Sequence, residues 1–150
     1  MKLRLKKEAT TYMPVLIRAV LSTRGSILEL GAGLFSTPLL HWLSAESRRP
    51  LLTCERDREY YEFARRFKSR THNVQLINDW NTIDTTTHWG VVLVDQDSER
   101  AKTAILLKDS ADVIILHDSD QEKLYGYNTV YPHFKYVAHW TFCKPYTSVV

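Results

Sequence analysis

Short apolar runs alternate with amphipathic segments along most of the chain, and this alternation limits the folds that the sequence can adopt. The apolar runs occupy residues 27–30, 51–54, 74–77, 91–94 and 113–116. Each run is too short for a buried helix and lacks the polar alternation of a strand with one face in water. Segments with helical periodicity lie between them, at residues 38–45, 58–67 and 99–107. We therefore expect a three-layer, doubly wound α/β fold with a mostly parallel sheet.

A further helix is expected before the first strand. Thr10 or Thr11 can cap a helix that runs to about Thr23. Pro14 is tolerated in this helix because it lies in the first turn, where no backbone N–H is needed. Gly25 is expected to end it.

The C-terminal part of the chain has a different pattern. Residues 133–142 and 146–150 read as two strands joined by a turn at 143–145. Because too few residues separate them for a helical crossover, we expect an antiparallel hairpin that closes the parallel sheet. The polar segment 81–88 fits either a short helix or a loop.

Length and composition are typical of one globular domain, here residues 1–150. Of these residues, 44% are hydrophobic and 25% are charged. Since no apolar run approaches the ~20 residues of a bilayer span, and no signal-peptide core follows the basic residues 2–7, we expect a cytoplasmic protein without a membrane segment. Cys54 and Cys143 form neither a metal-binding CxxC pair nor a disulfide framework.

The loop after the first strand is rich in glycine. Gly31 and Gly33 flank Ala32, and they permit positive φ angles and bring bare backbone close to a ligand. The helix that follows exposes N–H groups near Ser36 and Thr37, which favour a carboxylate or phosphate. Taken alone, the same glycines could serve only to turn the chain.

Acidic residues stand near the ends of the first three strands. Glu29 stands at the end of the first strand, Glu55 closes the second and Asp79 closes the third. An acid at the end of the second strand can accept hydrogen bonds from both hydroxyls of a ribose. An acid at the end of the third strand can accept a hydrogen bond from the exocyclic amine of an adenine. We expect the three carboxylates to converge on one crevice, although each alone could be a polar strand end.

These features together resemble the class I S-adenosylmethionine-dependent methyltransferases, which have a Rossmann-like fold with a closing antiparallel hairpin. The stretch "ELGAGLFS" resembles the first motif of that family, E-x-G-x-G. The stretches "LLTCERD" and "LINDW" resemble the acidic end of its second strand and its adenine-contacting third motif. The resemblance covers nearly the whole chain in order.

The resemblance implies S-adenosylmethionine as the cofactor, with Glu29 near the methionyl ammonium, Glu55 on the ribose hydroxyls and Asp79 at the adenine. A third glycine common in the family is missing and Phe35 stands in that vicinity, so the path of the loop stays open. The residues expected to bind the cofactor are Glu29, Gly31, Ala32, Gly33, Ser36, Thr37, Glu55, Arg56, Asp79, Trp80 and Asp95.

Candidate groups for methyl transfer follow the fourth and fifth strands. His117 can act as a general base, and Asp118 or Asp95 can orient its ring. The alternative is a histidine satisfied by backbone groups. Further charged residues nearby are Asp97, Arg100 and Asp120.

A metal ion is a second alternative at this place. Asp95 and Asp118 resemble, in their places at strand ends, the acids that ligate Mg²⁺ in the catechol-type O-methyltransferases. In that group an asparagine follows the second acid, whereas Ser119 stands here and is a weaker ligand. We therefore assign no metal ligand and do not favour Mg²⁺.

The stretch from Val113 to Val137 also resembles glycan O-methyltransferases with a His-Asp pair after the fifth strand, and this resemblance implies a methyltransferase acting on oxygen of a small molecule or a sugar. The motif "VDQD" lacks the Asn/Asp-Pro-Pro-Tyr/Phe pattern of amino-directed nucleic-acid enzymes, so nucleic acid is disfavoured, while a homo-oligomer stays open. The alternatives are a nucleoside-cofactor-binding module without transfer activity and, ranked lower, a nicotinamide-dependent oxidoreductase. The aromatic group that could line the acceptor pocket or pack as a lid is Tyr125, Tyr127, Tyr131 and His133.

Overall fold

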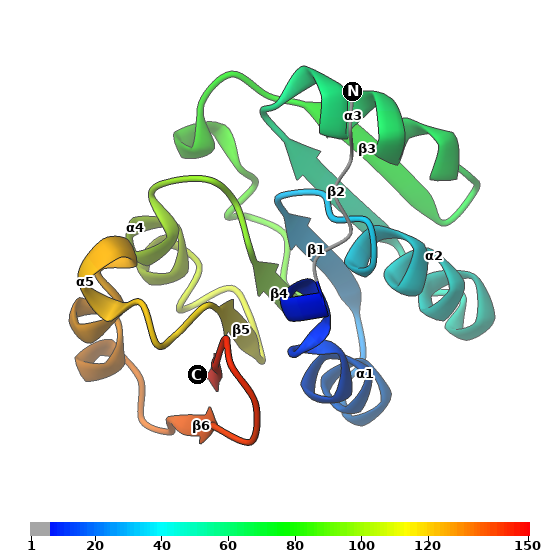
Figure 1. Ribbon diagram of the computed structural model, residues 1–150. Helices are drawn as coiled ribbons and strands as arrows, with labels where there is room; N and C mark the ends of the chain where they lie inside the picture. The colour runs from blue at the N-terminus through cyan, green and yellow to red at the C-terminus, as the bar shows by residue number, and fades with distance from the viewer. Residues whose placement is uncertain (1–6) are drawn as a thin grey trace.

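A twisted sheet forms the centre of the molecule (Figure 1). The computed structural model describes residues 7–150, and the basic residues 2–6 lie outside the described part. Within residues 7–150, seven strands form one sheet in the order β3-β2-β1-β4-β5-β7-β6. Their bounds are Ser26–Leu30 for β1, Leu51–Glu55 for β2, His72–Leu76 for β3, Trp89–Val94 for β4, Ile114–His117 for β5, Ala138–Trp140 for β6 and Thr147–Val149 for β7.

The expected doubly wound architecture is confirmed. Strands β1 to β5 are parallel, and β1 lies between β2 and β4. Strand β7 is antiparallel to both β5 and β6, as predicted for the C-terminal hairpin. Strand β6 is shorter than the predicted segment 133–142, because His133 belongs to a 3-10 helix that contains Pro132.

Helices cover both faces of the sheet. Buried side chains of α1 and α2 pack on one face together with Ile27, Val91 and Ile115. The other face carries Leu28, Val92 and Leu116, and α4 packs there. The helices are α1 (Met13–Ser22), α2 (Ser36–Ser47), α3 (Arg58–Ala64), α4 (Arg100–Leu106) and α5 (Glu122–Tyr125), with 3-10 helices η1 (Lys7–Thr10), η2 (Arg65–Phe67), η3 (Trp80–Thr82), η4 (Tyr127–Thr129) and η5 (Tyr131–His133).

Several helix starts differ from the predictions. Helix α1 begins after Tyr12, and neither Thr10 nor Thr11 caps it. The Thr11 hydroxyl instead donates to the carbonyl of Pro145, 2.7 Å away, and so ties the N-terminal segment to the C-terminal turn. Helix α2 already includes Thr37 and begins after Phe35. The undecided segment 81–88 holds only the end of η3 and then a loop.

The topology creates a crevice between β1 and β4. The strands are neighbours, but the chain leaves β1 toward α2 on one face and leaves β4 toward α4 on the other. Ligands of open α/β sheets bind at such a switch point, outside the carboxyl ends of the strands. In the described part of the chain, no helix has the length and apolar character needed to cross a bilayer.

Candidate functional site

A cavity of about 490 Å³ opens at the switch point, and we call it the loop cavity. This volume lies in the range of small-molecule sites. The residues after β1 form one wall, and the residues after β2 and β4 form others. The lining residues are Ala9, Tyr12, Gly31, Ala32, Gly33, Leu34, Phe35, Glu55, Asp57, Tyr60, Asp95 and Asp97.

Gly31 makes the close approach of the β1 and β4 ends feasible. Its φ angle is +88°, and a Cβ built on it would lie 2.6 Å from the carbonyl oxygen of Asp95. The backbone N–H of Asp95 donates to Leu30, 2.9 Å away, so the β4 strand end is held against this loop. Only glycine combines this backbone angle with this contact.

Glu55 organises the loops around the cavity. Its carboxylate accepts hydrogen bonds at 2.6 Å from the backbone N–H groups of Ala32, Arg56 and Asp57. Burial raises the pKa of Glu55, and these three hydrogen bonds oppose the increase. The end of β2 is thereby joined to the glycine loop, with the carboxylate on the cavity wall.

Glu29 lies beneath the loop and does not line the cavity. Its side chain is fully buried and accepts hydrogen bonds from the hydroxyls of Thr37, at 3.0 Å, and Thr53, at 2.6 Å. Thr37 in turn accepts the N–H of Gly33 at 3.1 Å. Burial raises the pKa of Glu29 to about 7, against these hydroxyl bonds, which lower it. Ser36 and Thr37, also buried, therefore shape the loop from below.

Asp79 is exposed at the end of β3, away from the lining of the loop cavity. It caps η3 through the N–H of Asn81, and this hydrogen bond lowers its pKa. Of the three acids expected to converge, the structure thus brings only Glu55 to the cavity wall.

Asp97 stands on the cavity wall in place of Asp79. The indole N–H of the buried Trp80 donates to Asp97 at 2.9 Å, and Arg56 forms an ion pair with the same carboxylate. Although burial raises the pKa of Asp97, these contacts leave it below its ordinary value. Trp80 and Arg56 themselves do not line the loop cavity but contact its wall through Asp97.

A second cavity of about 710 Å³ adjoins the first, and we call it the His117 cavity. The two cavities share Ala9, Tyr60 and Asp95. His117 and Asp118 line this second cavity together with Asp95, so the structure brings together the three residues that the sequence singled out as a candidate catalytic group. The buried His117 Nδ1 has no hydrogen-bond partner among residues 7–150, which the structure describes. His117 Nε2 lies 3.5 Å from Asp118 Oδ1.

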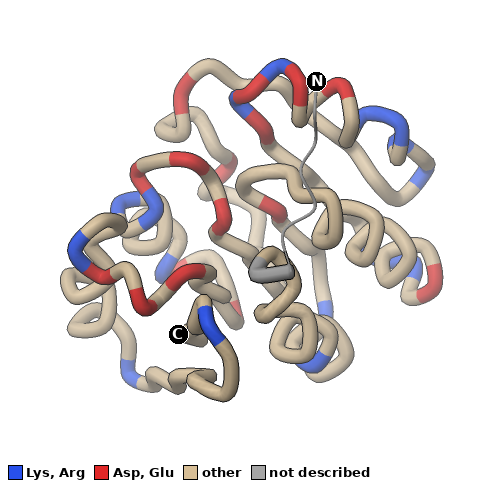
Figure 2. Tube along the Cα trace, in the orientation of Figure 1, with Lys and Arg blue, Asp and Glu red and all other residues tan. Residues whose placement is uncertain are grey.

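Arg100 connects the acids of this cavity. Its guanidinium forms ion pairs with Asp95 at 3.0 Å and with Asp118 at 3.1 Å. Burial raises the pKa of Asp95, while His117 and Arg100 act to lower it. Acidic residues also mark the loops that follow β4 and β5 in Figure 2.

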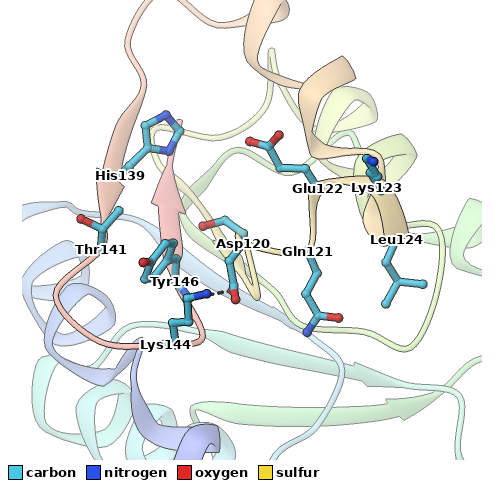
Figure 3. Close-up of a pocket in the computed structure, with 10 residues that line it drawn as sticks. Asp120, Gln121, Glu122, Lys123, Leu124, His139, Thr141, Lys144 and Tyr146 are labelled. Carbon is cyan, nitrogen blue, oxygen red and sulfur yellow. Dashed lines mark hydrogen bonds between the residues drawn. The ribbon is translucent and has the colours of Figure 1, made fainter.

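A third cavity, of about 780 Å³, continues from the His117 cavity toward the C-terminal hairpin. Figure 3 shows this hairpin cavity between α5 and the β6–β7 turn. Asp120, Gln121 and Lys144 line both, and the backbone N–H of Tyr146 donates to Asp120 at 2.9 Å. Ser119 faces the hairpin cavity and is not part of the His117 cavity lining.

The predicted aromatic group divides between cavity and core. Tyr125 lines the His117 cavity. The buried Tyr127 donates its hydroxyl to the carbonyl of His117 at 2.9 Å, and Tyr131 contacts Ser148. His133 lines none of the three cavities.

Sequence reasoning missed Tyr12, Asp57 and Tyr60. The Tyr12 ring packs edge-on against His117 with 4.6 Å between ring centroids, and so connects the start of α1 to the second cavity. Asp57 is the N-cap of α3 and Tyr60 lies in its first turn. The cap signal of Asp57 is visible in the sequence, but its position beside the glycine loop depends on how α3 packs.

Comparison with known proteins supports the fold. No protein-family model and no curated protein sequence matches the chain. Among solved structures, a Staphylococcus aureus protein assigned as a caffeoyl-CoA O-methyltransferase has a TM-score of 0.68 at 10% identity, over 97% of this chain and 83% of that one. Precorrin-6y C5,15-methyltransferase from Geobacter metallireducens GS-15 has a TM-score of 0.67 at 14% identity, over 99% of this chain and 93% of that one.

A third structure was solved with a bound nucleoside product. The N-terminal domain of EvdMO1 with SAH bound has a TM-score of 0.56 at 18% identity, over 75% of this chain and 50% of that one. These identities are low, so the likeness is one of architecture. The chain has the fold of the class I methyltransferases, as the resemblance of its motifs implied.

Proposed function

We propose that this chain is an S-adenosylmethionine-dependent methyltransferase that acts on oxygen of a small molecule or sugar. The observation that carries the proposal is the pair of adjoining cavities that share Asp95 at the switch point. The loop cavity, with Glu55 and the glycine backbone in its walls, suits the cofactor. The His117 cavity suits the acceptor, since it holds a candidate base.

The reaction requires little covalent chemistry from the protein. When bound, S-adenosylmethionine would supply a methyl group that its sulfonium activates for transfer, and the walls around Gly31 and Glu55 would hold it beside the acceptor hydroxyl. His117 Nε2 takes the hydroxyl proton, and the nearby Asp118 carboxylate stabilises the resulting imidazolium. The Tyr12 ring packs edge-on against the imidazole and limits its rotation. Positioning of the two reactants supplies the rest of the acceleration.

Cofactor binding is the first test, and Glu55→Gln is the informative variant. Wild-type protein should bind S-adenosylhomocysteine in calorimetry. Glu55→Gln loses the charge-assisted hydrogen bonds to the ribose hydroxyls, which contribute about 1.5–3 kcal/mol, so its affinity for S-adenosylhomocysteine should be about tenfold or more weaker than that of wild type. Asp79→Asn is the matched control, because Asp79 is exposed and off the cavity. Equal losses in both variants would restore the adenine role that the motif implies for Asp79, and no binding by wild type would refute the proposal.

Turnover tests the role of His117. His117→Ala removes the general base, so its turnover rate should be about 100-fold or more below that of wild type, whereas its affinity for S-adenosylhomocysteine should stay within about threefold of wild type. Product formation is measured over a panel of sugars, catechols and other hydroxylated acceptors, with His133→Ala as the control histidine outside the cavities. Unchanged turnover in His117→Ala would exclude His117 as the base. Cofactor binding without turnover over the whole panel would favour a binding module.

A further inference from the structure

The guanidinium of Arg100 lies between the two carboxylates at the ends of β4 and β5. Its Nη2 is 3.0 Å from Asp95 Oδ1 and its Nη1 is 3.1 Å from Asp118 Oδ2. The side chain is only 6% exposed. Because the guanidinium is largely shielded from water, its Coulomb attraction to both carboxylates is stronger than in a pair on the surface.

The rest of the Arg100 side chain is held as firmly. Nε donates to the carbonyl of Gln96 at 2.5 Å, Nη1 to that of His117 at 3.1 Å and Nη2 to that of Asp95 at 3.3 Å. The guanidinium also packs on the ring of Tyr125, 3.9 Å from its centroid. Each of the three guanidinium nitrogens therefore has a hydrogen-bond partner, so the position of the positive charge is determined by the fold.

The same place offers a set of metal-ligand atoms. Ligand atoms of Asp95, His117 and Asp118 lie within 4.8 Å of one another. A divalent ion there would need carboxylate oxygens that are free of other cations. One oxygen of each carboxylate is already bonded to Arg100, and adding a divalent ion would leave this buried cluster with a net positive charge. The residues present therefore do not fit a divalent ion.

We propose that Arg100 takes the place of a divalent cation in this protein, as a positioning residue that holds Asp95 and Asp118 side by side on the wall of the His117 cavity. The acceptor hydroxyl then loses its proton to His117 without help from a metal ion, and this consequence rests on the proposed transferase function. The inference that the Asp95–Asp118 cluster holds no divalent ion does not depend on that function. Removing the guanidinium should convert the cluster into a divalent-cation site.

Binding of Mn²⁺, followed by its electron paramagnetic resonance signal and by thermal unfolding, tests the inference. At about 1 mM Mn²⁺, wild type and Arg100→Lys should bind no ion through these acids, and their unfolding temperatures should not change. Arg100→Met leaves two carboxylates without a cation, so it should be less stable than wild type. It should bind Mn²⁺ with a Kd at least about tenfold below the ~1 mM at which wild type binds none, and the ion should raise its unfolding temperature. The double variant Arg100→Met, Asp118→Asn should lose this binding.

Two results would overturn the inference. One is Mn²⁺ binding by wild type that disappears in Asp118→Asn, because the native acids would then be metal ligands. The other is an Arg100→Met protein that Mn²⁺ neither binds nor stabilises, including the case in which it stays unfolded in Mn²⁺ while Arg100→Lys folds. Neither measurement involves the cofactor, so a protein that fails to bind S-adenosylhomocysteine would refute the proposed function and leave this test intact.

Discussion

Gly31→Ala is expected to destabilise the protein and to abolish S-adenosylhomocysteine binding. Any side chain at this position meets two costs. The φ angle of +88° disfavours an L residue by about 1–2 kcal/mol, and the added Cβ would lie 2.6 Å from the carbonyl oxygen of Asp95, a contact that costs a further ~1–3 kcal/mol. Since this oxygen belongs to the backbone, the strand end after β4 must shift and deform the wall that the loop cavity and the His117 cavity share.

Gly25→Ala is the matched control for this variant. Gly25 also has a positive φ, +84°, but a Cβ there would come no closer than 3.6 Å to its neighbours. Gly25→Ala should therefore lower the free energy of unfolding only by the cost of the positive φ angle, and it should keep its affinity for S-adenosylhomocysteine. Chemical denaturation and calorimetry measure the two effects. Equal stabilities of the two variants, with S-adenosylhomocysteine binding retained in Gly31→Ala, would show that the β1 and β4 ends do not meet at Gly31.

Glu29→Gln is expected to increase the free energy of unfolding at pH 8 and to flatten its dependence on pH. The pKa of Glu29 is about 7 in the folded protein, above its ordinary 4.5, because the carboxyl group is buried. The folded state therefore binds the proton more tightly than the unfolded state, so its stabilising effect is complete below pH ~4.5 and is lost as the pH rises through ~7. A shift of this size corresponds to about 3 kcal/mol.

Urea denaturation of wild type and Glu29→Gln between pH 5 and 8 measures this effect. Asp79→Asn is the control acid, because the pKa of Asp79 is lowered and its contribution is lost only at acid pH. Parallel pH profiles of wild type and Glu29→Gln would contradict the burial argument. A loss of S-adenosylhomocysteine affinity in Glu29→Gln would support the contact with the methionyl ammonium that the motif resemblance implies.

Local patterns predicted most of the sheet. The apolar runs and the spacing between them give the five parallel strands and the antiparallel closure, because burial on both faces leaves an unmistakable composition in a short strand. Helix starts were predicted less well. The sequence predicts Thr11 as a candidate helix N-cap, but its hydroxyl instead donates a hydrogen bond to the carbonyl of Pro145, 134 residues away in the chain.

The candidate site shows the same division. Placing Gly31, Glu55, Asp95 and His117 at strand ends needed only the knowledge that parallel strands end at one edge. The orientations of Glu29 and Asp79 could not be predicted in the same way. Glu29 points toward Thr37 and Thr53 beneath the loop, and Asp79 caps its own 3-10 helix, while Asp97 takes the place on the cavity wall.

The sequence by itself determined the doubly wound fold, the glycine loop and the edge of the sheet at which the acids gather, because these depend on periodicity and on backbone freedom within short segments. Only the tertiary structure decided which acids face a cavity and which cation accompanies them. Arg100 is adjacent to Asp118 only when β4, α4 and β5 have assembled, so the ion pairs that underlie the proposed replacement of a metal ion depend on that packing. The physical reason is that the charge balance of a buried cluster is summed over residues distant in the chain, so no local pattern contains it.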